Sequence, residues 1–315
     1  DSSWYFLRYC DPDNTEAPWD SAITDRWMPV DQYIGGVEHA ILHLLYARFF
    51  VKAFADMGRL GVQEPFARLF TQGMITRDGA KMSKSKGNVV SPREYVERYG
   101  ADTARCYILF IGPPDRDADW SDAGVGGVHR FLSRLWTLAV EAPGEPSAPE
   151  PAGREPSPLL RKAHWAIHRV TRDMQHNFAF NTAIAAVMEL VNEVYRQRES
   201  VPAADVRFAI ATAGSLIFPF APHLGAEVYE RLTGRRAWEE PWPEADPALL
   251  VSDEIQLVVQ LNGKLIDRLP APAQASQEEL EEIARGSDKL SARLNGKEIV
   301  KAIVVPGRLV NFVAK

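Results

Sequence analysis

Cysteine is nearly absent from this 315-residue sequence, which contains only Cys10 and Cys106, far apart and in no Cys-x-x-Cys arrangement. A disulfide framework or a cysteine-rich zinc site requires several cysteines at short, regular spacings. The sequence therefore predicts neither of these, and it fits a protein of the reducing cytoplasm.

A long hydrophobic run is absent too. The most apolar stretch, 209–222, contains Pro219 and is shorter than the roughly 20 residues that cross a bilayer. The next candidate, 37–57, includes acidic, basic and imidazole side chains. We therefore expect no membrane segment and no membrane partner. The chain begins at Asp1 without the pattern of a signal or transit peptide, so we expect a fragment or a processed piece.

An excess of positive charge is the third missing feature, because 42 acidic residues exceed 36 basic ones and leave a net charge of -6. A polyanionic partner must therefore be met by local basic patches. The hydrophobic content of 46% is enough for apolar cores, and 315 residues exceed the usual single domain of roughly 100 to 200 residues. We expect a multidomain protein with two or three folded units.

The first part of the chain shows an α/β pattern. The letters YIGGV from residue 33 predict a short buried strand, followed by a helix over 38–57. A second strand is expected at about 72–76, before a Gly- and Lys-rich loop at 78–88. Ser91-Pro92 then predicts the start of a helix, with a second helix soon after it.

Proline dominates the middle of the chain, where residues 142–158 contain six prolines in seventeen positions and almost no large apolar side chain. Such a segment cannot build a core, and it predicts a stiff surface linker. On both sides of it, apolar residues recur with the period of a helix. An all-α helix bundle is therefore expected over about 123–235, within a domain at 123–247.

The end of the chain changes to a β pattern. The letters IQLVVQLNGKLIDRLPAP predict two strands joined at Asn262-Gly263, which is a strong hairpin signal. Ser276 and Glu279 predict a capping box at the start of a helix, and two further strands are expected between residues 299 and 313. Residues 248–315 are therefore expected to form a small α+β domain.

A basic loop, Lys81-Met82-Ser83-Lys84-Ser85-Lys86, concentrates three lysines and two hydroxyl groups. Lysine is a mobile point charge suited to polyphosphate, and flanking glycines allow such a loop to close over a ligand. A loop that is merely solvated can have the same composition. Composition alone leaves both interpretations open.

The letters KMSKS in this loop are the signature of the class I aminoacyl-tRNA synthetases. In its full context the chain resembles the leucyl-tRNA synthetase family, because further family motifs occur in the family order along essentially the whole chain. The segment EHAILHLLY favours leucine over the valine, isoleucine and methionine relatives. The motifs are DSSWYFLRY, YIGGVEHAILHLLYARFF, TQGMI, KMSKSKGNVVSP and YGADTARCYILFIGPP.

The resemblance implies a fold with three parts. These are the distal half of a Rossmann-like catalytic domain at 1–122, a helical anticodon-arm bundle at 123–247 and a small tRNA-binding domain at 248–315. In the family an editing domain interrupts the catalytic domain, and this chain resembles the portion after the interruption. The seven histidines include no His-x-Gly-His signature of the first half, and the threonine-rich editing pocket is missing.

The activity implied by the resemblance is the activation of leucine with ATP to leucyl-adenylate and the transfer of leucine to tRNA(Leu). Lys81 and especially Lys84 are then expected to neutralise charge on the β,γ-phosphates, with Mg²⁺ sharing that task. Met82, Ser83 and Ser85 belong to the same nucleotide site. Lys86 is explained as well by surface charge.

The same resemblance assigns residues near the first strand. Gly35 and Gly36 would let the nucleotide approach the backbone, and Glu38 would accept hydrogen bonds from both ribose hydroxyls. A glutamate that only complements a helix dipole is the alternative for Glu38. The positions that match the lining of the leucine side-chain pocket are Ser2, Tyr5, His39 and His43.

Two other interpretations stay open at this point. His39 and His43 have the i, i+4 spacing of zinc ligands, but Glu38 precedes the pair and no third ligand is evident, so no metal site is expected. A chain without the His-x-Gly-His half could also be a noncatalytic tRNA-binding subunit of a split synthetase, whose partner is the amino-terminal half.

The last residues are basic although the whole chain is acidic. Residues 289–315 contain six lysines or arginines and one glutamate. Such a patch is typical of polyanion binding, and the resemblance assigns this domain to the tRNA elbow. His164 and His168 share a helical face with Arg161 and Arg172; a solvated polar face is expected there, and a surface that faces tRNA is the alternative. The tRNA-binding candidates are Lys289, Arg293, Lys297, Lys301 and Arg308.

Overall fold

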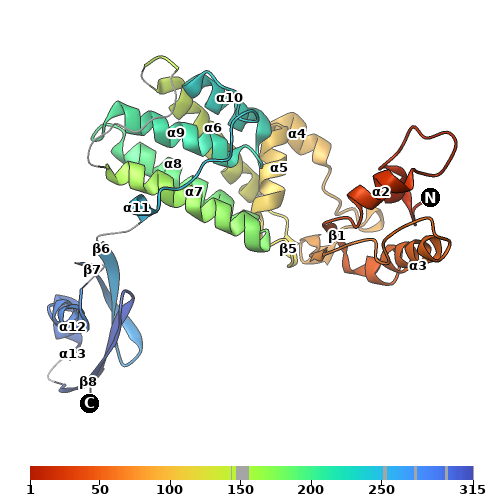
Figure 1. Cartoon of the computed structure of the whole chain (residues 1–315). Helices are drawn as coiled ribbons and strands as arrows, with labels where there is room; N and C mark the ends of the chain where they lie inside the picture. Colours follow the sequence, from red (N-terminus) through yellow and green to blue (C-terminus); the bar gives the residue numbers. More distant parts are fainter. Residues whose placement is uncertain (143, 147–155, 251–253, 273–274, 295–296, 315) are drawn as a thin grey trace. The chain divides into compact units, whose positions relative to one another are not determined.

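The computed structural model describes residues 1–142, 144–146, 156–250, 254–272, 275–294 and 297–314 (Figure 1). The chain forms two compact units, Asp1–Glu244 and Ala245–Lys315. The expected division of the first unit into a catalytic and a helical domain at residue 122 stays a prediction.

The first unit begins with a β-α-β arrangement. Strand β1 (Tyr33–Gly36) pairs in parallel with β2 (Leu69–Gln72), and helix α3 (His43–Asp56) lies between them in the chain. Parallel neighbours require such a crossover, so the expected α/β pattern is present. Two short helices, α1 (Tyr5–Arg8) and α2 (Ser21–Trp27), precede the first strand. The core of this region consists of Phe6, Leu7, Trp19, Met28, Ala47, Val51 and Leu60.

Two expectations for this region need correction. The helix over 38–57 is two elements, a 3-10 turn η1 (Val37–Ala40) and α3, because the backbone of Leu42 leaves the helical region at φ -114° and ψ -101°. Strand β1 is not buried, since Ile34 is 57% exposed. The reason is that β1 has only β2 as a strand neighbour in the described part of the chain.

The expected strand at 72–76 is wrong. Strand β2 ends at Gln72, and a different strand, β3 (Ile75–Arg77), begins after a bend at Gly73. Gly73 packs so closely on a distant segment that a Cβ at this position would lie 2.2 Å from the carbonyl carbon of Arg116. The Gly73 N–H also donates to the Pro114 carbonyl at 2.8 Å. The bend therefore depends on a tertiary contact that no local pattern reveals.

Strand β3 is the centre of a second small sheet. Strand β4 (Ala80–Lys81) pairs with it antiparallel, and β5 (Ala118–Asp119) pairs with it in parallel. Asp78 and Gly79 form the turn between β3 and β4, and their φ angles are 55° and 69°. Two positive φ angles are typical of a tight hairpin turn. The lysine loop, residues 81–88, follows at once, so its upstream end is attached to this sheet.

Two helices follow the lysine loop, α4 (Pro92–Tyr99) and α5 (Ala101–Phe110). Both were expected, and Pro92 occupies the first turn of α4, where its missing N–H costs no helical hydrogen bond. The Ser91 side chain makes no capping hydrogen bond. Helix α5 packs against helices of the bundle described next.

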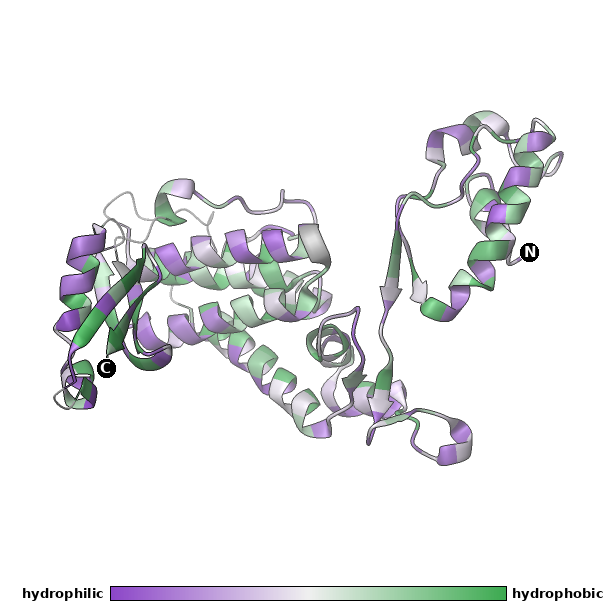
Figure 2. Ribbon diagram, turned by 90° about the horizontal axis from the view of Figure 1, so that it is seen from below, coloured by the Kyte–Doolittle hydropathy of each residue, from purple (hydrophilic) through white to green (hydrophobic). Residues whose placement is uncertain are grey.

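Five helices form the expected all-α bundle. Helix α9 lies at its centre, because it packs against the other four and nearly all of its residues are buried. Figure 2 shows apolar and polar residues on different sides of the other helices, as amphipathic packing requires. The helices are α6 (Asp122–Glu141), α7 (Pro158–Asn177), α8 (Phe180–Gln197), α9 (Ala203–Ile217) and α10 (Pro222–Thr233).

Asp102 fastens α5 to this bundle. Its carboxylate accepts a hydrogen bond from the Leu224 N–H at 2.7 Å and lies 3.1 Å from Nδ1 of His223, both at the start of α10. The first N–H groups of a helix need external acceptors, and the N-cap residue of α10, Ala221, supplies none. Asp102 therefore acts as the cap of a helix that is distant in sequence.

The proline-rich linker joins α6 to α7, as expected. Ser157 begins α7, since its hydroxyl accepts from the Leu160 N–H at 3.1 Å. At the other end, the Arg207 guanidinium donates to the carbonyls of Gly144 and Glu145 at 3.1 and 2.8 Å. Residue 143 and residues 147–155 of the linker lie outside the described residues.

The expectation of a solvated face at His164 is wrong. His164 is only 8% exposed and stacks on Phe208 of α9, with ring centroids 5.4 Å apart. Position 164 continues the stripe of Leu160 and Ile167, which is buried because α7 packs on α9. His168 is exposed, as expected.

The second unit is a small α+β fold with the strand order β7-β6-β9-β8. The hairpin at Asn262-Gly263 is confirmed, with Leu261 opposite Lys264. The capping box of Ser276 and Glu279 is confirmed as well. Helix α13 was missed. The elements are α11 (Pro247–Leu250), β6 (Glu254–Leu261), β7 (Lys264–Pro272), α12 (Gln277–Arg285), α13 (Asp288–Leu294), β8 (Ile299–Val305) and β9 (Leu309–Ala314).

Membrane-spanning helices and disulfides can be checked in the described ranges. No helix there combines the length and the apolar character that crossing a bilayer requires. Cys10 and Cys106 both carry free thiols. Burial raises the pKa of the Cys106 thiol to about 12, so this group is protonated and unreactive near neutral pH.

We predict that Gly225→Ala destabilises the bundle. A Cβ on Gly225 would lie 2.6 Å from Cα of Phe218 and 2.8 Å from the Gly214 carbonyl oxygen, and both are backbone atoms that cannot turn away. Overpacking of this kind costs about 1–3 kcal/mol. Urea unfolding followed by far-ultraviolet circular dichroism measures the loss.

The matched control is Gly126→Ala in α6, where the nearest atom to the new Cβ is the Arg130 guanidinium at 3.5 Å. This change removes a helical glycine without a clash and should stabilise by about 0.5–1 kcal/mol. Equal stabilities of the two variants would contradict the close packing of α9 and α10.

Candidate active site

The glycine corner at the end of β1 brings together three of the expected nucleotide-binding residues. Gly35 and Gly36 end the strand, and Glu38 follows in η1. A Cβ on Gly36 would lie 2.2 Å from a carboxylate oxygen of Glu38, so the carboxylate occupies the space that any larger residue would fill. The carboxylate is exposed and available to a ligand.

His43 is the centre of the second group of expected residues. Its Nε2 lies 2.7 Å from the Ser2 carbonyl oxygen and its Nδ1 lies 3.0 Å from the Tyr33 hydroxyl. A carbonyl can only accept, so Nε2 carries the proton and Nδ1 accepts from the hydroxyl. The Tyr5 ring stacks on the imidazole at 5.6 Å, and the His39 ring meets it edge-on at 6.4 Å.

All four expected leucine-pocket residues are therefore neighbours, although Ser2 contributes its backbone carbonyl rather than its hydroxyl. Nδ1 of His39 is buried and has no hydrogen-bond partner among the described residues. A buried polar atom of this kind is costly unless a ligand or a water satisfies it. The arrangement can thus surround a small ligand with aromatic and imidazole walls.

Tyr33 is a member of this cluster that the sequence analysis missed. It stacks on His43 with ring centroids 5.5 Å apart and contacts Phe66 at 4.6 Å. Burial raises the pKa of the Tyr33 phenol, and the nearby Tyr5 adds to this shift. The only sequence signal was an aromatic residue two positions before Gly35.

The lysine loop presents its charges to solvent. Lys81, Lys84 and Lys86 are exposed, and no carboxylate of the described residues lies within salt-bridge distance of any of them. Lys84 and Lys86 belong to a single 3-10 turn, η2 (Lys84–Lys86). The loop therefore offers uncompensated positive charge, which is what a polyphosphate requires.

Two polar side chains that the sequence analysis missed fix the shape of the loop. Asn88 bonds to the backbone of Ser83 and of Lys81, at 2.9 and 3.3 Å. Asp119 of β5 accepts from the Thr76 hydroxyl at 2.7 Å and from the Gly79 N–H at 3.0 Å. These hydrogen bonds, that of Thr76 foremost, hold the pKa of the Asp119 carboxyl below its usual range.

A cluster around Asp122 connects the loop region to the bundle. The carboxylate at the start of α6 accepts from the Tyr95 hydroxyl and, at 2.9 Å, from Nε1 of Trp120. Arg77 of β3 lies 3.8 Å from the same carboxylate. Strand β3, helix α4 and helix α6 thus meet at one acidic group.

The glycine corner makes no hydrogen bond or ion pair to residues 81–88 in the described part of the chain, so the candidate site has two separate parts.

The described residues contain no group of three or more His, Cys, Asp or Glu side chains placed to hold a metal ion. His39 and His43 therefore lack the further ligands that zinc needs. The lysine loop carries ammonium and hydroxyl groups but no carboxylate, so it does not fit a Mg²⁺ site made by the protein alone.

The expected tRNA-binding cations of the second unit fall into two groups. Lys289 donates to the Asp267 carboxylate at 2.6 Å, so its charge is already balanced. The other four are exposed and make no ion pair with the described residues. They are Arg293 on α13, Lys297 before β8, Lys301 on β8 and Arg308 in the turn before β9.

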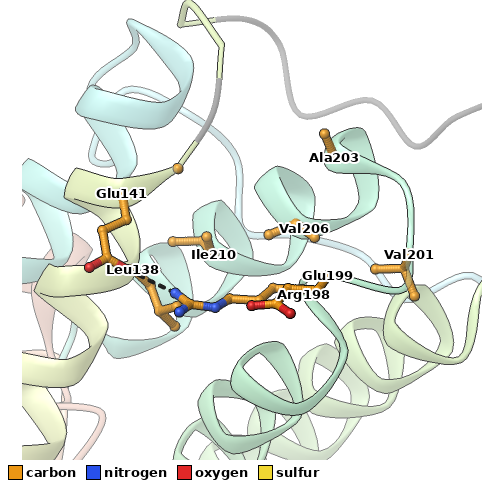
Figure 3. Close-up of a pocket in the computed structure, with 9 residues that line it drawn as sticks. Leu138, Glu141, Arg198, Glu199, Val201, Ala203, Val206 and Ile210 are labelled. Atoms are coloured by element: carbon orange, nitrogen blue, oxygen red, sulfur yellow. Dashed lines mark hydrogen bonds and ion pairs between the residues drawn. The ribbon is translucent and has the colours of Figure 1, made fainter.

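A cavity of about 320 Å³ lies elsewhere, in the bundle between the ends of α6 and α8 and the start of α9 (Figure 3). Leu138, Val206 and Ile210 form its apolar wall, and an ion pair between Arg198 and Glu141 at 2.8 Å crosses it. None of the residues expected to bind ATP, leucine or tRNA lines it.

Comparison with protein families and solved structures agrees with the geometry. Residues 25–121 match the family described as tRNA synthetases class I (I, L, M and V). Residues 158–282 match the family described as the anticodon-binding domain of tRNA ligase. The chain belongs to the class I tRNA synthetases.

Within that class its relatives are leucine–tRNA ligases, and the chain is homologous to a portion of each of these enzymes. It is 45% identical to the enzyme of Symbiobacterium thermophilum over 100% of its own length and 41% of the relative. The enzyme of Pseudothermotoga lettingae is 47% identical over 99% of the chain and 39% of the relative. The chain thus spans about two fifths of the curated relatives that it matches.

A solved structure has a similar fold. The ternary complex of an Agrobacterium radiobacter LeuRS with tRNA and LeuAMS superposes with a TM-score of 0.81 and 34% identity, over 100% of this chain and 42% of that one. Methionyl-tRNA synthetase of Mycobacterium tuberculosis, at 19% identity and a TM-score of 0.51 over 78% of this chain and 53% of that one, shares the fold alone.

We predict that His43 carries its proton on Nε2. Nitrogen-15 spectra at pH 8 should show the Nε2–H tautomer, and Tyr33→Phe should shift the Nδ1 resonance because its hydrogen bond is lost. Tyr9→Phe is the control, since Tyr9 is 72% exposed and its hydroxyl makes no hydrogen bond with the described residues. A dominant Nδ1–H tautomer would contradict the arrangement.

Proposed function

We propose that this chain supplies the lysine-loop half of the catalytic site and the tRNA-binding regions of a leucine–tRNA ligase. The observation that carries the proposal is the identity of 45–48% with leucine–tRNA ligases over at least 99% of the chain. The substrates are leucine, ATP and tRNA(Leu), and the compartment is the cytoplasm. Residues 1–122 belong to the catalytic domain, 123–247 to the anticodon-arm bundle and 248–315 to the terminal tRNA-binding domain.

The reaction has two steps. In the first, a carboxylate oxygen of leucine bonds to the α-phosphorus of ATP, and the bond from that phosphorus to the β-phosphate breaks, releasing pyrophosphate. In the second, a hydroxyl of the terminal ribose of tRNA attacks the leucyl carbonyl carbon, and AMP leaves. Neither step needs covalent chemistry from the protein, so catalysis depends on alignment and on stabilising charge.

The lysine loop stabilises the charge of the leaving pyrophosphate. Lys81 and Lys84 are catalytic groups in this proposal, because their ammonium charges are exposed and uncompensated. Met82, Ser83 and Ser85 complete the contact with the nucleotide. Mg²⁺ binds to the phosphates of ATP and neutralises part of their charge.

The glycine corner and the His43 cluster bind the other ends of the two small substrates. Gly35 and Gly36 admit the nucleotide, and the exposed carboxylate of Glu38 accepts hydrogen bonds from the ribose hydroxyls. Tyr5, His39 and His43 surround the leucine side chain as walls, and Ser2 fixes the His43 imidazole through its carbonyl.

The proposal is tested by leucine-dependent exchange of pyrophosphate into ATP. We expect the purified chain to be inactive, because it lacks the His-x-Gly-His half, and we expect addition of the amino-terminal portion of the protein to restore exchange. Exchange by the chain alone, free of host synthetase, would overturn the interpretation that its catalytic site is incomplete. No exchange by the assembled protein, together with tRNA binding, would favour a noncatalytic tRNA-binding subunit.

We predict that Lys84→Ala in the assembled enzyme lowers turnover by about two to three decades, as does the loss of another preorganised electrostatic donor. The ATP KM should change less, because the charge is needed most in the transition state. Lys86→Ala is the matched control, since it removes an equally exposed cation two residues away and should have the smaller effect. A defect confined to the ATP KM would remove Lys84 from this role.

We predict that the chain binds tRNA(Leu) without the catalytic partner and that the second unit contributes. Removal of 251–315 should weaken binding and flatten its salt dependence. The slope of the logarithm of the binding constant against the logarithm of the salt concentration should become less steep by about 0.7–0.9 for each phosphate contact that is lost. Replacing Arg293, Lys297, Lys301 and Arg308 by alanine should have a similar effect, whereas Lys289→Ala should not, because Asp267 already balances Lys289. Titrations at several salt concentrations measure this, and equal slopes throughout would mean that the first unit alone holds the RNA.

A further inference from the structure

We propose that Asn88 is a positioning residue that holds the lysine loop closed. Its side-chain oxygen accepts a hydrogen bond from the Ser83 N–H at 2.9 Å, and its side-chain nitrogen donates to the Lys81 carbonyl at 3.3 Å. One amide therefore joins the last residue of the loop to the backbone on both sides of Met82. The catalytic consequence of this closure rests on the proposed function, but the closure itself does not.

The backbone of the loop is shaped to bring Asn88 back to the start. The Lys86 N–H donates to the Ser83 carbonyl at 3.1 Å, and the Gly87 N–H donates to the Lys84 carbonyl at 3.2 Å. Gly87 then adopts a φ of 65°, a left-handed conformation that favours glycine and reverses the chain. Asn88 follows directly, and its side-chain amide returns to the backbone of Lys81 and Ser83. The turn and the amide thus close residues 81–88 into a ring.

Little else in the described residues holds this ring. The ladder between β3 and β4 reaches only as far as Lys81, opposite Thr76. Ser83 and Ser85 share a hydroxyl contact at 3.2 Å on an exposed surface. Val89, the next apolar side chain, is 46% exposed and gives weak anchorage. The amide of Asn88 is therefore the main side-chain tie between the two ends of the loop.

The link to catalysis is preorganisation. An ammonium group stabilises developing charge best when its backbone is already in place, because no ordering is then required at the moment of reaction. Asn88 fixes the backbone at Lys81 directly. Through its hydrogen bond with Ser83, it also fixes the turn that carries Lys84. An amide suits this task because it donates and accepts at once without adding charge to a phosphate site.

Tryptic cleavage of the native chain tests the closure without any need for activity. Trypsin cuts after Lys81, Lys84 and Lys86 only when the loop opens into an extended form, and mass spectrometry resolves the rate at each bond. Asn88→Ala should raise these rates by about tenfold, since two hydrogen bonds are lost. Asn88→Asp should give an intermediate rate, because a carboxylate still accepts from Ser83 but cannot donate to Lys81.

The control is Val89→Ala, a change of similar size at the neighbouring position, which should leave the cleavage rates near those of the unchanged chain. Circular dichroism of each variant checks that the bundle remains folded. Loop cleavage in Asn88→Ala at the rate of the unchanged chain would overturn the proposal.

The assembled enzyme gives the second measurement. Asn88→Ala should lower kcat of pyrophosphate exchange by about ten- to a hundredfold while the leucine KM stays within about threefold, and Asn88→Asp should recover part of the loss. Faster cleavage with an unchanged kcat would overturn the positioning role. If the unchanged assembled protein shows no exchange, the proposed function fails, and the tryptic comparison still decides whether Asn88 closes the loop.

Discussion

The contact of Gly73 with the backbone at Arg116 is the constraint on which the first unit depends. Because residue 73 has no side chain, the chain can leave the sheet of β1 and β2 there and pair β3 with β5. Strand β5 leads directly into α6, so the hairpin before the lysine loop is attached to the start of the bundle. Asp119 and Asp122 strengthen this junction from either side of Trp120. A side chain at position 73 would separate the loop from its support.

Pairing of charges explains how an acidic chain presents cationic sites. In the bundle, many basic side chains are held by carboxylates: Arg169 and Arg172 by Asp173, and Lys162 by Glu189. Such pairs contribute little to stability at the surface, but they cancel the field of the cations that they hold. The loop lysines have no such partner among the described residues. A net charge of -6 therefore coexists with a local concentration of positive charge where a polyphosphate would bind.

The two parts of the candidate site, the His43 cluster and the lysine loop, are held in place by different interactions. The His43 cluster is rigid, because its imidazole stacks on the rings of Tyr5 and Tyr33 and is hydrogen-bonded at both nitrogens. The lysine loop is held by one amide and a short turn, so it can open and close at low cost. A rigid pocket suits the selection of a small side chain, whereas a loop that closes suits a ligand that must enter and a product that must leave. Under the proposed function, the selection of leucine and the stabilisation of phosphate charge would therefore lie in different parts of the site.

The sequence alone determined the elements whose signals are local. The hairpin at Asn262-Gly263 follows from two residues that tolerate positive φ, the helix after Ser276 follows from a capping box, and the bundle follows from helical periodicity. The KMSKS letters placed the lysine loop. Tertiary structure alone decided the bend at Gly73 and the roles of Tyr33 and Asn88. Each of these depends on atoms brought near from elsewhere in the fold, such as Arg116 and His43, or on the path of a turn, and spacing along a chain does not encode such contacts.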